Sequence, residues 1–89
     1  MSTQQAAADQ VREAGKGHAT IAVQAAQDAL ASVAQGDPNT AIQSMNTAAQ
    51  NITLAQQATS VVDDPELSSQ VAEASQIVAQ AAASIQSQG

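Results

Sequence analysis

The 89-residue sequence contains no cysteine and no aromatic residue, and it has only two basic residues. The lack of cysteine excludes disulfide bonds and thiolate metal sites, and it gives no information on the redox compartment. The lack of aromatic residues removes the usual anchors of tight interfaces and the rings on which nucleobases stack. The two basic residues, Arg12 and Lys16, leave a formal charge of −6, which argues against binding to nucleic acid or to anionic membrane surfaces.

The sequence also lacks long apolar runs. No stretch of about 18 apolar residues is present, so we expect no membrane insertion. Residues 1–10 have neither a charged segment nor an apolar one after it, so we expect no ordinary secretory signal. The expected location is the cytoplasm by default, and export by a route that reads no such signal stays open.

Alanine and glutamine are the commonest residues, with 22 and 15 positions. Sequences of low charge and low complexity can be disordered. Here, however, apolar residues recur at steps of three and four over long windows, which indicates amphipathic helices. Only sixteen of them are Val, Ile, Leu or internal Met, so the predicted core is thin. We expect marginal stability as a monomer, or stabilisation by self-association.

Three such windows, separated by two turn sequences, predict an all-α fold. The clearest window spans residues 65–88, whose apolar seam consists of Leu67, Val71, Ala74, Val78, Ala81 and Ile85. Residues 38–61 precede it, with a seam that consists of Ala41, Met45, Ala48, Ile52, Ala55, Thr59 and Val62. The first helix is predicted over residues 3–35, with Val11, Ala19, Ala22, Val23, Ala26, Leu30 and Val33 on its apolar side.

The first helix contains two glycines, Gly15 and Gly17, and each costs about 1 kcal/mol relative to alanine in a helix interior. The apolar residues keep their phase across both glycines, so we predict that the helix continues, with a bend at this point or fraying over residues 1–17. A flexible arm followed by a helix from about residue 18 is the alternative. Ser2 and Gln5 have the spacing of a capping box at the helix start.

Both turns contain residues that are typical of the end of one helix and the start of the next. Gly36 suits the left-handed position after a helix, Asp37 can cap the next helix, and Pro38 fits its first position. The Asp-Pro step recurs at Asp64. Because the first connection is only two or three residues long, the helices that it joins must be antiparallel. We therefore predict one domain over residues 1–89, an Ala-rich, up-down-up antiparallel three-helix bundle.

The candidate reactive residues do not form a catalytic group. His18 is the only histidine, and no cysteine or acid in helical register completes a metal site or a nucleophile triad with it. The sequence Gly15-Lys16-Gly17 lacks the frame of a phosphate-binding loop. We therefore predict that the protein is not an enzyme and has no catalytic residue, cofactor or metal ligand.

Two surfaces remain as candidates for binding. Asp63, Asp64 and Glu66 form an acidic corner that would suit a weak Ca²⁺ site, although the spacing of a calcium-binding loop is absent and helix capping explains the same residues. Three apolar residues lie off the main seams, and we predict that they contact a protein partner or a second copy: Ile21, Leu54 and Val61.

Residues 25–48 resemble the helical hairpin of a tetratricopeptide repeat. The aromatic positions of that family are absent and no second unit follows, so the resemblance implies only the antiparallel packing of two helices. The matching positions are Ala29, Gly36, Asp37, Ala41, Ile42 and Ala48.

Residues 61–67, Val-Val-Asp-Asp-Pro-Glu-Leu, are similar to the turn of the needle and inner-rod subunits of type III secretion systems. Those subunits are small, cysteine-free helical hairpins. The Tyr-Asn segment that follows their turn is absent, and this chain has an additional hairpin. The similarity implies self-assembly.

The predicted function is that of a non-enzymatic helical bundle that acts through protein–protein association, with self-assembly as one form of it. A small-ligand or weak Ca²⁺-binding module at residues 63–66 is one alternative. A secretion-system-like filament subunit is the other.

Overall fold

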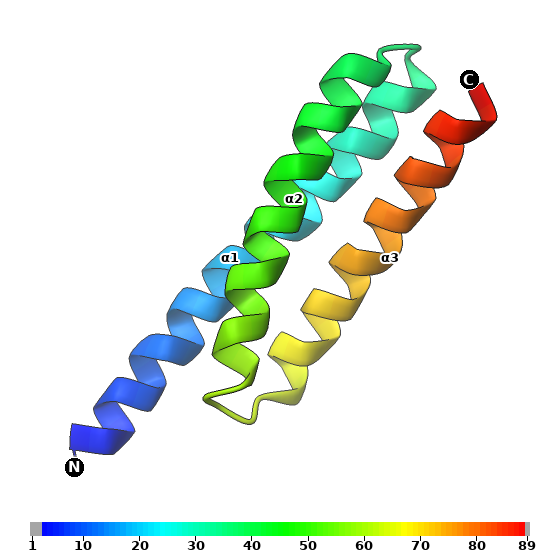
Figure 1. The fold of residues 1–89 in the computed structure, drawn as a ribbon. Coiled ribbons are helices and arrows are strands. Elements are labelled where there is room, and N and C mark those ends of the chain that lie inside the picture. The colour runs from blue at the N-terminus through cyan, green and yellow to red at the C-terminus, as the bar shows by residue number, and fades with distance from the viewer. Residues whose placement is uncertain (1–2, 89) are drawn as a thin grey trace.

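The computed structural model describes residues 3–88 and contains three helices: α1 (Thr3–Ala34), α2 (Pro38–Thr59) and α3 (Pro65–Gln88). The helices run up, down and up in an antiparallel bundle, and each contacts the other two (Figure 1). The bundle is elongated, with principal extents of 54 × 17 × 14 Å. The predicted all-α fold and the three-helix architecture are confirmed.

The turn between α1 and α2 has the hydrogen bonds of a Schellman motif, and α1 ends one residue before the predicted position. Gly36 adopts a φ of +82°, and its N–H donates to the Val33 carbonyl at 3.0 Å. The Asp37 N–H donates to the Ser32 carbonyl at 2.9 Å. Asp37 also caps α2, because its carboxylate accepts the Thr40 N–H at 3.2 Å and the Thr40 hydroxyl at 2.7 Å. The predicted cap is confirmed.

The C-terminal end of α2 lies at Thr59, two residues earlier than predicted. The N–H groups of Val61 and Val62 both donate to the Ala58 carbonyl, at 3.1 and 2.9 Å. One carbonyl therefore serves two donors, which tightens the last turn and takes the chain out of helical geometry. Val61 is consequently part of the turn rather than of the helix.

The core consists mainly of small side chains. Residues of the three predicted seams are buried or half-buried, as predicted. Leu67 is the only large side chain that is fully buried among the described residues. The cluster around it lies near the α2–α3 turn and consists of Ala19, Ala55, Ala58, Val62, Leu67 and Val71. A smaller cluster lies nearer the other end and is formed by Ala25, Ala26 and Ala48.

The two glycines of α1 have different surroundings, although the helix continues through both of them from Thr3. A Cβ atom on Gly15 would lie 2.6 Å from the Ala58 Cβ and 3.0 Å from the Leu67 Cδ2, whereas a Cβ on Gly17 would meet nothing within 4 Å. Gly15 therefore allows α1 and α2 to approach closely. Residues 3–17 are helical, so the alternative of a flexible arm is wrong for them. Ser2 of the predicted capping box lies outside the described residues.

Candidate functional site

An open groove lies between α1 and α2, near the end of the bundle that carries the α2–α3 turn. Its volume is about 280 Å³. The lining residues of α1 lie within one face of that helix, and those of α2 lie on its last two turns together with Val61 of the following turn. The lining carries no carboxylate and no ammonium or guanidinium group, and it consists of Val11, Ala14, Gly15, His18, Leu54, Gln57, Ala58 and Val61. This lining is called the α1–α2 groove below.

The three residues predicted to contact a partner are all exposed. The exposed fractions are 47% for Ile21, 42% for Leu54 and 66% for Val61. Leu54 and Val61 line the α1–α2 groove, and Ile21 lies three residues after His18 on α1, outside the lining. Ile42 was not among the residues predicted to contact a partner, although it is 46% exposed. It lies about a third of a turn around α2 from Leu54 and is not part of the groove.

His18 is half-buried beside the groove and is hydrogen-bonded to α2. Asn51 Nδ2 donates to the Thr47 carbonyl at 2.9 Å, which leaves the Asn51 Oδ1 as an acceptor. His18 Nδ1 lies 3.1 Å from that oxygen, so this nitrogen carries the donated proton. The bond joins α1 to α2 and occupies one ring nitrogen. Within the described part of the chain, no group of three His, Cys, Asp or Glu residues is placed to hold a metal ion.

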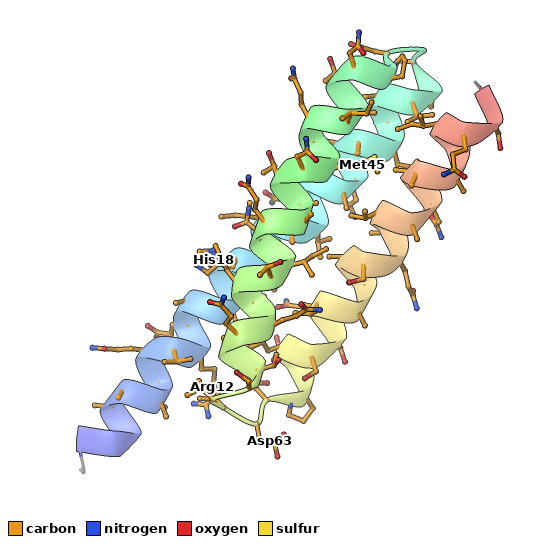
Figure 2. All side chains as sticks on the ribbon, in the orientation of Figure 1. Arg12, His18, Met45 and Asp63 are labelled. Carbon is orange, nitrogen blue, oxygen red and sulfur yellow. The ribbon has the colours of Figure 1, made fainter. Side chains whose placement is uncertain are left out.

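The predicted acidic corner faces the two basic side chains of the sequence. Asp64 Oδ2 lies 3.2 Å from Arg12 Nε and 3.6 Å from Lys16 Nζ. Glu66 Oε2 lies 3.8 Å from the same Lys16 Nζ. Figure 2 shows Arg12 on α1 next to the turn that carries Asp63. These ion pairs join α1 to the α2–α3 turn and the start of α3. The paired residues are 48 to 52 positions apart in the sequence, and the pairs were not predicted.

Asp64 also caps α3. Its Oδ1 accepts the N–H groups of Glu66 and Leu67 at 3.0 and 3.3 Å, as predicted for this position. Burial is the largest single influence on the pKa of Asp64 and raises it, but the backbone hydrogen bonds and the two cations outweigh burial and hold the pKa below its ordinary value of 3.8. A calcium ion at this corner would have to compete with both cations for the same carboxylate.

We expect the free energy of unfolding to fall as the pH is lowered through 3.8. A depressed carboxyl pKa stabilises the folded state above the unfolded value, and that contribution is lost as the pH falls through the folded pKa of Asp64. Asp37 acts in the same direction, because the hydrogen bonds from the hydroxyl and N–H of Thr40 lower its pKa. Urea unfolding followed by circular dichroism across this pH range measures the effect.

The matched variants are Asp64→Asn and Asp63→Asn. Asp64→Asn should lower the melting temperature at neutral pH, because it removes the charge that Arg12 and Lys16 face. It should also reduce the fall in the free energy of unfolding at acidic pH. Asp63 is exposed and makes no ion pair within the described chain, so its substitution should leave the profile nearly unchanged. If the free energy of unfolding fell equally at acidic pH in Asp64→Asn and in the original protein, Asp64 would not be a source of the pH dependence.

The sequence matches no protein-family model, no curated protein and no solved structure. None of the helices in the described chain is long and apolar enough to cross a membrane.

Proposed function

We propose that this chain is a non-enzymatic helical-bundle protein that acts by protein–protein association through the α1–α2 groove. The observation that carries the proposal is the exposure of Leu54 and Val61 in an uncharged groove, in a chain whose other apolar seams are buried or half-buried. Removing apolar surface from water is favourable by about 25 cal/mol per Å², and only the part that exceeds the lost freedom of the two partners appears as affinity. The exposed apolar side chains beside α1 and at the C-terminal end of α2 form a surface on which a further helix can pack.

The reactive side chains support a binding role rather than a catalytic one. The single histidine is held by Asn51 through Nδ1. The two cations are held by Asp64. These groups stabilise contacts between helices, and the groove itself offers shape and apolar surface.

The partner is a second copy of this chain or a different protein. The thin core and the similarity to secretion-system subunits favour self-assembly, including assembly into a filament. Calcium binding at residues 63–66 is the alternative function, and a calcium titration followed by amide NMR separates the two. Because Asp64 already faces two cations, we expect no shifts localised near residue 63, and localised shifts would support the calcium site.

Sedimentation velocity from low to high micromolar concentration tests self-association. If copies associate through the groove, Leu54→Gln should weaken association on the order of tenfold, because it replaces an apolar contact by a polar amide. Ile42→Gln is the matched control, since Ile42 is similarly exposed and lies outside the groove. A strict monomer at every concentration would exclude self-association and leave a different protein as the partner.

The choice of face has its own test. Charged substitutions at Ile21, Leu54 and Val61 should each reduce association, either between copies or with a captured partner. If the three variants change neither, another surface carries the function.

A further inference from the structure

We infer that the α1–α2 groove receives a basic amphipathic helix of a different protein. The inference rests on the proposed function, because it names the partner of the same surface. The groove supplies the apolar contact, and the charges around it decide which kind of helix fits.

An exposed carboxylate flanks each end of the apolar surface. Ala14, Ile21 and Asp28 follow one another at steps of seven along α1, so they lie on the same face of that helix. At the other end, Asp63 follows Val61 by two residues, in the α2–α3 turn (Figure 2). Both acids are exposed, and neither makes an ion pair within residues 3–88.

The two basic side chains do not neutralise the Asp63 end of this surface. Arg12 and Lys16 lie at the same turn, but their ion pairs engage Asp64 and its neighbours, and the acids at this corner outnumber the two cations. The last turn of α2 contains no basic residue, so no positive side chain of α2 offsets the negative end of its helix dipole near Val61. The apolar groove is therefore bounded by negative potential.

The thin core favours self-assembly, but the same charges argue against a second copy as the occupant of this groove. Each copy carries a formal charge of −6, so two copies would bring like charges together. A helix with Lys or Arg at both ends of an apolar seam would instead pair with Asp28 and Asp63. The 14 residue steps from Ala14 to Asp28 span about 21 Å of helix, so a partner helix of about 18 residues is long enough.

A synthetic peptide of that design tests the inference against the full chain. The peptide has about 18 residues, leucines at steps of three and four, and paired lysines at each end. The control peptide has glutamates in place of the lysines. Calorimetric titration should show binding of the lysine peptide that is at least about tenfold tighter than that of the control and that weakens with added salt. Amide NMR shifts should map to the groove.

Single substitutions in the protein locate the contacts. We expect Leu54→Gln to weaken binding of the lysine peptide about tenfold. Asp28→Asn and Asp63→Asn should each weaken it about threefold, because exposed ion pairs contribute little individually. Ile42→Gln should have no effect, since this residue lies outside the groove.

Four results would overturn the inference. Equal binding of the two peptides would show that charge does not select the partner, and shifts confined to α3 would place the site elsewhere. A concentration-dependent dimer that Leu54→Gln disrupts, in a chain that binds neither peptide, would identify a second copy as the occupant and leave the proposed function in place. A monomer that binds neither peptide would overturn the inference and leave a protein partner of different chemistry for the proposed function.

Discussion

Replacing Leu67 by alanine is expected to lower the free energy of unfolding by about 3 kcal/mol, a large part of the stability of so small a domain. Leu67 is fully buried and lies in the cluster that joins all three helices. Its neighbours include Ala19 and Ala55, whose methyl groups cannot move to fill a cavity. The loss should therefore include a cavity term as well as the lost burial. Urea unfolding followed by circular dichroism measures it.

Leu54→Ala provides the matched control, because the same chemical change is made where the side chain is 42% exposed. We expect a loss of less than about 1 kcal/mol at this position. Equal losses for the two variants would contradict a core centred on Leu67. The pair also shows whether the groove residue is required for folding, which the binding experiments depend on.

Replacing Gly15 by alanine is expected to destabilise the protein by about 2 kcal/mol, although alanine is the better helix former. The new Cβ would lie 2.6 Å from the Ala58 Cβ, which is closer than two carbon atoms approach, and 3.0 Å from the Leu67 Cδ2. The Ala58 Cβ is fixed to the backbone, so α1 and α2 would have to separate. The cost of separation should exceed the gain in propensity of about 1 kcal/mol.

Gly17→Ala should have the opposite sign and stabilise the protein by up to about 1 kcal/mol, because nothing lies within 4 Å of the new Cβ. Adding Ala58→Gly to Gly15→Ala should recover part of the lost stability, since it removes the Ala58 Cβ that the new Cβ would contact. Thermal and urea unfolding of these three variants and the original protein measure both effects. A stabilised Gly15→Ala protein would show that the two helices do not meet at this point.

The helices and turns could be predicted because their causes are local. The seam from Leu67 onward depends only on spacing along one helix. The stop at Gly36 and the cap at Asp37 need only neighbouring backbone groups, and the structure has both. Helix ends shifted by one or two residues, as at Thr59, where a competing hydrogen bond decided the outcome.

Contacts between helices were harder to predict, because alanine-rich seams specify the register only loosely. The same role was predicted for both glycines of α1, although the spacing from Val11 through Gly15 to Ala19 already placed the first one on the apolar side. The groove could be anticipated in part, from apolar residues off the seams such as Leu54. The bond between His18 and Asn51 required the antiparallel register, and nothing in the sequence pattern supplied it.

The odd number of helices fixes where the two chain termini lie. Thr3 and Gln88 are at opposite poles of a molecule 54 Å long (Figure 1). Joining the termini for circular permutation would therefore need a linker of at least about 16 extended residues. Direct head-to-tail fusion of two copies would, in contrast, extend the rod along its own axis.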